Sequence, residues 1–115
     1  MKLYIYPNCS SCKKATSFMK KLSIQCEIVN IKDNPPTTHE LEKMLKAHGQ
    51  IRKLFNTSGK QYRELDMKSK LLEMTDQQAI QLLSKNGMLI KRPFLIGAKT
   101  ALLGFKEELW LSEIR

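Results

Sequence analysis

The first thirty residues switch from an extended to a helical and back to an extended pattern, and this order limits the possible fold more than any other feature. Residues 2–6 alternate Leu and Ile with Tyr, which predicts a short strand. Residues from about 12 to 22 carry apolar side chains at helical spacing, and Ser10 or Ser11 is expected to cap this helix. Residues 24–31 predict a second strand. A strand, a helix and a strand in this order form a βαβ unit whose two strands are parallel.

The middle of the chain predicts helices. Pro35 and Pro36 interrupt the pattern, and Thr37 and Glu40 then have the spacing of a capping box at the start of a helix. Further helical pieces follow, so we expect a helical insert over about residues 37–86.

The C-terminal part predicts a hairpin and a closing helix. Residues 94–96 and 100–103 are the expected strands of the hairpin, and residues 106–114 are the expected helix. The order is then β-α-β, a helical insert and β-β-α, which is that of a thioredoxin-like α/β fold with a helical subdomain. The length of 115 residues is that of one domain, and we expect a single domain over the whole chain.

Cysteine content and hydropathy indicate a reducing compartment. Three cysteines among 115 residues argue against a disulfide scaffold and favour chemistry or packing for each thiol. No apolar run approaches the roughly 20 residues of a membrane span, and the N-terminus lacks the long apolar stretch of a signal peptide. We therefore expect a cytoplasmic protein without membrane contact, where thiols are kept reduced. We also expect a monomer.

The chain is strongly basic, with a net charge of +9 and a pI near 9.6. This balance favours anionic partners, which include oxyanions, acidic protein surfaces and nucleic acid. The Lys and Arg residues are spread along the whole length, so a solvated basic surface without an anionic partner is an equal alternative. No predicted helix concentrates basic and base-reading residues, and direct DNA binding is not expected.

Cys9 and Cys12 lie between the first predicted strand and the first predicted helix. Two thiols at this spacing around a first helical turn are close enough to form a disulfide. The helix N-terminus offers unpaired N–H groups, and Lys13 and Lys14 add positive charge, so we expect the pKa of Cys9 to lie below its free value. Cys9 is therefore the expected nucleophile, and Cys12 is the expected resolving thiol.

A zinc site is the alternative role for this pair. Such a site needs a second pair of ligands, and the rest of the chain offers only Cys26, His39 and His48, which lack the spacing of a ligand pair. Redox chemistry is therefore favoured. Cys26 is expected to be a buried strand residue rather than a third redox partner. No nucleotide, flavin or metal motif is present, so we predict no bound cofactor.

Arg92 and Pro93 come immediately before the third predicted strand. In thioredoxin-type folds a cis-proline at this place faces the reactive cysteine, and an arginine just before it can approach Cys9 and support the thiolate. The alternative is an ordinary proline at the start of a strand with a solvent-facing arginine. The residues expected to contact substrate lie at the helix N-terminus and beside this proline: Ser10, Ser11, Lys13 and Pro93.

Four segments are distinctive when they are taken together. They are Cys9-x-x-Cys12 followed by Lys13-Lys14-Ala15, the Pro35-Pro36 break, Phe55–Gly59 with Tyr62–Leu65, and Gly87–Pro93. They resemble the arsenate reductase/Spx family over nearly the whole chain, and in particular its short arsenate reductase-like members. The resemblance implies a thioredoxin-like core with a helical insert, Cys9 as the reactive cysteine and Arg92 as its neighbouring arginine.

The arsenate reductases of this family that are coupled to glutathione and glutaredoxin hold the oxyanion with three arginines around one cysteine. Only Arg92 matches here, because the other two positions carry Asn56 and Gly104. Arg52 or Arg63 can in principle substitute. The departure weakens arsenate as the substrate.

The Spx-type regulators of the family use a CxxC pair as a redox switch and bind the α-subunit of RNA polymerase. This chain shares the CxxC pair and Gly104, but it carries Asn56-Thr57-Ser58-Gly59 where those regulators carry a Ser-Thr-Arg-Ser stretch. The resemblance implies a thiol–disulfide redox protein that is reduced by thioredoxin or by glutathione and glutaredoxin. A redox-sensing regulator that binds the polymerase α-subunit is the alternative.

Overall fold

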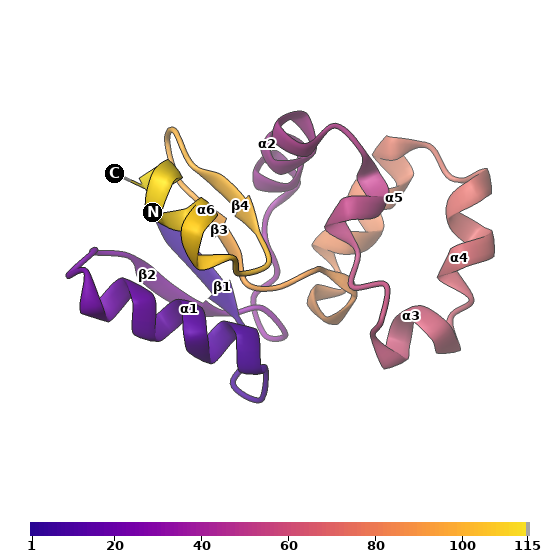
Figure 1. The fold of residues 1–115 in the computed structure, drawn as a ribbon. Coiled ribbons are helices and arrows are strands. Elements are labelled where there is room, and N and C mark those ends of the chain that lie inside the picture. Colours follow the sequence, from indigo (N-terminus) through magenta and orange to yellow (C-terminus); the bar gives the residue numbers. More distant parts are fainter. Residues whose placement is uncertain (115) are drawn as a thin grey trace. The chain divides into compact units, whose positions relative to one another are not determined.

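The computed structural model describes residues 1–114, and its elements follow the predicted order (Figure 1). The strands and α-helices are β1 (Lys2–Ile5), α1 (Ser10–Lys21), β2 (Glu27–Asn30), α2 (Thr38–His48), α3 (Lys60–Glu64), α4 (Met67–Lys70), α5 (Asp76–Ser84), β3 (Phe94–Ile96), β4 (Ala101–Leu103) and α6 (Glu107–Ile114). Short 3-10 helices lie at Ile51–Leu54, Leu71–Glu73 and Gly87–Leu89. The predicted thioredoxin-like α/β fold with a helical insert is confirmed.

The described residues divide into two compact units. Residues 1–30 together with the chain from Arg92 onward form the first unit, which contains the sheet, α1 and α6. Residues 31–91 form the second unit, which contains α2 to α5 and includes the predicted insert. The expectation of a single domain stays a prediction.

The sheet brings the two halves of the first unit together. Its strands lie in the order β2-β1-β3-β4, with β1 and β2 parallel, as predicted, and β3 antiparallel to both of its neighbours. Tyr4 lies opposite Phe94, and their rings meet edge to face with centroids 5.6 Å apart. This register places the segment before β3 next to the segment after β1, from which Cys9 follows.

The helices α1 and α6 pack on one face of this sheet. Leu3, Leu95 and Leu102 lie opposite one another in neighbouring strands and therefore share a face. They form one buried cluster with side chains of both helices: Ala15, Phe18, Met19 and Trp110. Burial of each large apolar side chain contributes about 1.5–3 kcal/mol. The cluster thus fixes α1, which carries the cysteine pair.

The second strand begins later than predicted. β2 starts at Glu27 because the preceding residues close α1. The Ile24 N–H donates to the Met19 carbonyl at 2.9 Å, and Ser23 between them has a left-handed φ of 56°. This arrangement is the Schellman motif, which ends a helix and turns the chain. The prediction for Cys26 was therefore wrong, because it lies before the strand and is half-buried.

Two capping boxes start helices of the second unit. Thr37 Oγ1 accepts from the Glu40 N–H at 3.1 Å, and Glu40 Oε1 accepts from the Thr37 N–H at 3.0 Å, as predicted. Thr75 and Gln78 form the same reciprocal pair at the start of α5. The helix α2 ends at His48, and Gly49 caps it with a left-handed φ of 82°, which suits glycine.

Gly87→Ala is expected to destabilise the protein by about 3 kcal/mol. A Cβ at this position would overlap the backbone carbonyl of Ile31, which cannot rotate away. Urea unfolding followed by circular dichroism measures the loss. Gly97→Ala is the control, because its Cβ would meet the flexible side chain of Met1, and we expect a loss below about 1 kcal/mol. Equal losses in the two variants would contradict this account.

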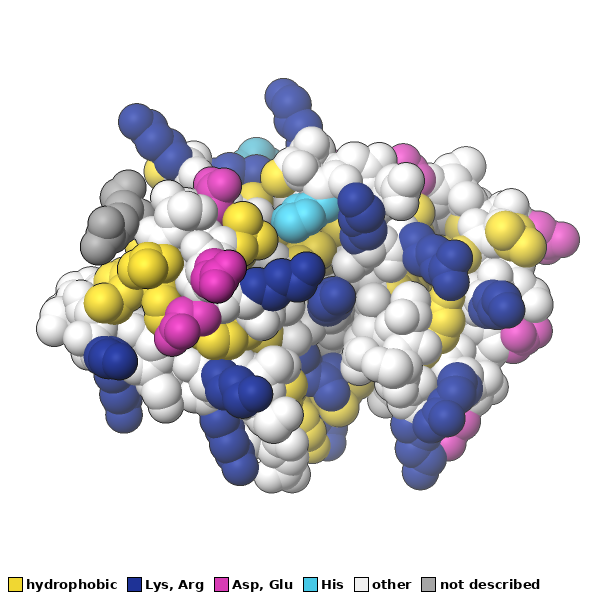
Figure 2. Space-filling view, viewed as in Figure 1, with side chains coloured by type: hydrophobic (Ala, Val, Ile, Leu, Met, Phe, Trp, Pro, Cys, Tyr) yellow, Lys and Arg dark blue, Asp and Glu magenta, His cyan; other side chains and the backbone are white. Residues whose placement is uncertain are grey.

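The surface shows how the basic residues are distributed. Lys and Arg side chains are scattered over the visible face and are not gathered in one patch (Figure 2). The basic residues are therefore scattered on this face, as they are along the sequence. None of the helices in residues 1–114 has the length and apolar character that crossing a bilayer requires.

Candidate active site

Cys9 caps the first helix with its own side chain. Its N–H donates to the Tyr6 carbonyl at 3.1 Å, which closes the turn after β1. Its backbone is extended (φ −97°, ψ 120°), and its Sγ accepts from the Cys12 N–H at 3.4 Å. The prediction that Ser10 or Ser11 caps this helix was wrong, because both residues lie inside α1. A sulfur at the cap satisfies an N–H group that the start of a helix otherwise leaves unpaired.

Ser11 connects Cys9 to the segment before β3. Its Oγ lies 3.2 Å from Cys9 Sγ and 3.5 Å from the carbonyl oxygen of Arg92. A serine hydroxyl has a single proton to donate. Ser11 can donate it to the Arg92 carbonyl while Cys9 is a thiol, and to Sγ once Cys9 is a thiolate.

The surroundings of Cys9 favour its thiolate form. Partial burial raises the pKa of the Cys9 thiol, but the hydrogen bonds from Ser11 and Cys12 and the positive charge of Arg92 lower it by more. The pKa therefore lies below the ordinary cysteine value, as predicted. The positive charge that lowers it is that of Arg92, which the sequence indicated together with Lys13 and Lys14, and neither lysine is among the causes.

The surroundings of Cys12 favour its protonated thiol form. Its side chain is only 1% exposed, and its Sγ accepts from the Tyr6 N–H at 3.4 Å. Burial, followed by the hydrogen bond to Cys9 and the charge of Cys9, raises the pKa of Cys12 to about 12. Cys12 is therefore a thiol at neutral pH and is shielded from external molecules.

Arg92 lies beside this pair. The Arg92–Pro93 peptide bond is cis, as expected for the fold. The Arg92 guanidinium carbon lies 5.3 Å from the centroid of the Tyr6 ring, a cation–π distance that holds the positive charge near the start of α1. Pro93 is buried, and its carbonyl accepts from the Gly104 N–H at 2.9 Å.

Tyr6 is the residue of this site that the sequence did not single out. It contributes its N–H to Cys12 and its ring to Arg92. In the sequence it is the last residue of the first predicted strand, and its place directly before the Pro7 turn was the only signal.

The remaining predicted contact residues lie on the first turn of α1. Ser10 and Lys13 are exposed there, on either side of the half-buried Ser11 and the buried Cys12. Their role as substrate contacts stays a prediction.

Cys26 is not part of the Cys9–Cys12 pair, and His39 and His48 belong to the second unit. Cys26 packs against the core cluster, and burial raises the pKa of its thiol. The thiols of Cys9, Cys12 and Cys26 are all free. Among residues 1–114, no group of three or more His, Cys, Asp or Glu side chains is placed to hold a metal ion.

Gly104 has a structural role in the first unit. Its φ is 68°, and its carbonyl accepts from Trp110 Nε1 at 3.0 Å. An arginine would be strained here by about 1–2 kcal/mol, because its Cβ disfavours this left-handed conformation. Arg52, Asn56 and Arg63 belong to the second unit.

Ser11→Ala is expected to slow alkylation of Cys9 by about tenfold at a pH below the Cys9 pKa, because a hydrogen bond to a charged group contributes about 1.5 kcal/mol or more. Ser10→Ala is the matched control, since Ser10 is the exposed neighbour. Iodoacetamide labelling followed by mass spectrometry at several pH values measures both rates. The midpoint of the pH profile moves upward only in Ser11→Ala. If both variants behave like the parent protein, Ser11 does not stabilise the thiolate.

The chain is similar to a known protein family over almost its whole length. Residues 4–112 match the model of the ArsC family. The uncharacterized protein YusI of Bacillus subtilis (strain 168) is 38% identical over 106 residues, which are 91% of this chain and 90% of YusI.

Two further proteins are similar over most of the chain. The global transcriptional regulator Spx of Streptococcus mutans (UA159) is 29% identical over 107 residues, which cover 92% of this chain and 77% of Spx. The crystal structure of a possible arsenate reductase from Streptococcus mutans UA159 has a TM-score of 0.86 and is 36% identical, and the match covers 94% of this chain and 95% of that one.

Proposed function

Because this chain belongs to the ArsC family, we propose that it is a thiol–disulfide redox protein in which Cys9 is the nucleophilic thiolate and Cys12 is the resolving thiol. The observation that carries the proposal is the asymmetry of the pair. Cys9 is half-exposed with a lowered pKa, whereas Cys12 is buried with a raised pKa. A low-pKa, accessible thiolate beside a protected thiol is the arrangement that disulfide exchange requires.

The first step forms a mixed disulfide. Cys9 Sγ attacks one sulfur of a substrate disulfide and forms a new S–S bond to it. The substrate S–S bond breaks, and the second substrate sulfur leaves with the electron pair and takes a proton from solvent. Arg92 stabilises the thiolate before attack and lies where it can hold an anionic group of the substrate.

The second step releases the substrate. Cys12 loses its proton to solvent and attacks Cys9 Sγ, so that a Cys9–Cys12 bond forms and the substrate leaves as a thiolate. Two of the causes that raise the pKa of Cys12 are the hydrogen bond and the charge of Cys9. Both disappear once Cys9 is in a mixed disulfide, so the pKa of Cys12 falls when its thiolate is needed. The substrate has then gained two electrons.

The backbone of the first turn and of the proline segment positions the substrate in this proposal. Ser10 and Lys13 are exposed beside Cys9 and are available to contact it. Ser11 holds the thiolate, and Pro93 fixes the segment whose Arg92 carbonyl accepts from Ser11.

Reduction of the Cys9–Cys12 disulfide completes the cycle. It takes two electrons from an external dithiol such as thioredoxin, or from two glutathione molecules with glutaredoxin. Titration of the pair in glutathione and thioredoxin buffers, read by mass-resolved thiol labelling, tests the proposal. We expect a reversible loss of two thiols per chain. If Cys9 and Cys12 never pair, the two-cysteine mechanism fails.

A redox-sensing regulator is the second candidate, and the 29% identity to Spx over 92% of the chain favours it. In this case oxidation of the pair would change affinity for the RNA polymerase α-subunit. Titration of the reduced and the oxidised protein with the isolated α-subunit distinguishes the two functions. A regulator binds stoichiometrically in one redox state, whereas an enzyme turns over with a thiol donor.

Arsenate reduction has less support. Position 104, which matches an oxyanion-binding arginine of arsenate reductases, holds a glycine in a conformation that disfavours arginine. Arg92 is then the one arginine beside Cys9 in the first unit, as far as residues 1–114 show.

A further inference from the structure

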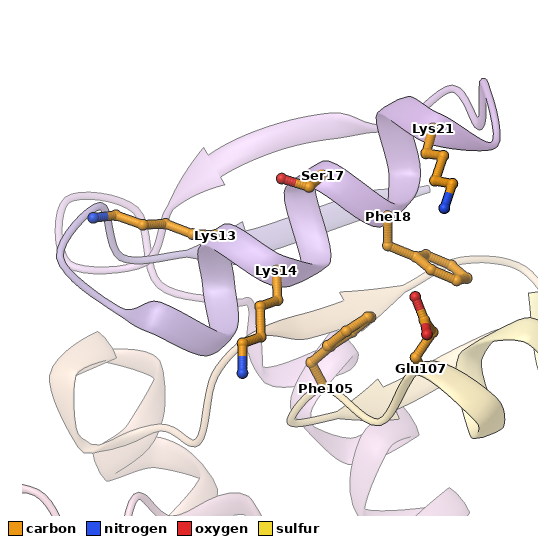
Figure 3. A pocket seen from close by; sticks show the side chains of 7 residues that line it. All are labelled: Lys13, Lys14, Ser17, Phe18, Lys21, Phe105 and Glu107. Atoms are coloured by element: carbon orange, nitrogen blue, oxygen red, sulfur yellow. The ribbon is translucent and has the colours of Figure 1, made fainter.

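A groove with a volume of about 610 Å³ lies between α1 and the start of α6 (Figure 3). Both of its walls belong to the first unit. Of the residues named for the redox steps above, only Lys13 also lines this groove. Phe105 and Glu107 line one side of it, and the α1 side is lined by Lys13, Lys14, Ser17, Phe18 and Lys21.

The floor of the groove is aromatic and held in place from behind. The rings of Phe18 and Phe105 meet edge to face with centroids 5.5 Å apart. The fully buried ring of Trp110 packs behind them, with its centroid 5.0 Å from that of Phe105 and 6.2 Å from that of Phe18. Phe105 is only half-buried, so part of this floor remains available to a ligand.

Positive charges lie at the two ends of this floor. Lys14 and Lys21 are seven residues apart on α1, which is about two turns and about 10 Å along the helix. Figure 3 shows Lys14 beside Phe105 and Lys21 beyond Phe18. The Glu107 carboxylate lies between these ends, next to the two rings.

We propose that this groove binds an acidic segment of a partner protein, with an apolar side chain on the exposed part of Phe105, beside the buried Phe18, and carboxylates at Lys14 and Lys21. A spacing of about 10 Å corresponds to three or four residues of extended chain. An aromatic floor favours an apolar anchor, and the net charge of +9 attracts an acidic partner. An inorganic anion is too small to reach both lysines and gains nothing from the floor.

The position of Glu107 limits where the carboxylates of the ligand can bind. Its charge repels a carboxylate placed at the centre of the groove, so the ligand's carboxylates are directed to the two ends. The site includes neither Cys9 nor Cys12 and shares only Lys13 with the proposed redox site, so it goes beyond the proposed redox function.

Trp110 provides the measurement, because it is the single tryptophan of the chain and lies directly behind the groove. The probe is a synthetic peptide with one phenylalanine flanked on each side by two glutamates. Titration at low salt is expected to change the Trp110 fluorescence to a saturating value. Control peptides with glutamine for glutamate, or with alanine for phenylalanine, are expected to bind at least about fivefold more weakly.

Matched variants locate the binding site. Lys21→Glu is expected to weaken binding by about fivefold or more, while Glu107→Gln strengthens it. Lys20→Glu makes the same charge change one residue earlier on α1, outside the groove lining, and is expected to change the affinity less than about twofold. Cys9→Ser is expected to bind the peptide as the parent protein does, which separates this test from that of the redox function.

Two results would overturn the proposal. One is an equal loss of affinity in Lys20→Glu and Lys21→Glu, because the peptide would then respond only to the net charge. The other is a linear fluorescence change without saturation in the parent protein.

Discussion

Cys9→Ser is expected to lower the rate of disulfide reduction by about a thousandfold or more, because the variant lacks the attacking atom. A serine at this place still caps α1, since its Oγ is a good acceptor for the Cys12 N–H. The loss therefore reports chemistry rather than unfolding. A model disulfide with a dithiol reductant, followed by absorbance, measures the rate.

Cys26→Ser is the matched control for this loss. Cys26 is a half-buried thiol of the same unit, and it lies outside the proposed mechanism. We expect its variant to keep most of the activity. Retained turnover in Cys9→Ser, or an equal loss in Cys26→Ser, would remove Cys9 from the centre of the reaction.

Cys12→Ser is expected to stop the reaction one step later. Cys9 still attacks, but no second thiol is present to release the substrate, so a mixed disulfide accumulates. Oxidised glutathione is a suitable substrate, and intact-protein mass spectrometry detects one added glutathionyl group per chain. The parent protein is expected to pass through this species without accumulating it, because Cys12 resolves it.

The position of the added group provides the internal control. Peptide mapping is expected to find it on Cys9 and not on Cys26, whose pKa is raised by burial. If the parent protein accumulates the mixed disulfide as strongly as Cys12→Ser, Cys12 is not a resolving thiol. The pair would then act as a single-cysteine system.

A local signal in the sequence predicted the start of α2 well. The capping box at Thr37 and Glu40 depends on residues three apart, and the structure reproduces it. The boundaries around Cys9 and Cys26 were harder to predict. A sulfur is not among the usual capping atoms, and Ser23 is not a residue that typically ends a helix in the left-handed conformation.

The part of the candidate site that depends on local sequence was also predictable. The strand–CxxC–helix order placed Cys9 at a helix start, so its lowered pKa was expected. The contact between Ser11 and the Arg92 carbonyl joins residues that are 81 positions apart, and no local pattern encodes it. The ring of Tyr6 under Arg92 depends on the same pairing of β1 with β3.

The capping role of Cys9 also enters the equilibrium between the dithiol and the disulfide. Once Cys9 is bonded to Cys12, its sulfur carries no charge and is a poorer acceptor for the first turn of α1. The fold thus stabilises the reduced form of the pair and makes the disulfide form a stronger oxidant. The pKa of Cys9 is lower in the folded than in the unfolded chain. The stabilisation of the reduced protein by the Cys9 thiolate is therefore complete above the unfolded pKa, and it disappears as the pH falls through the folded pKa. A helix cap therefore helps to set the direction in which electrons flow.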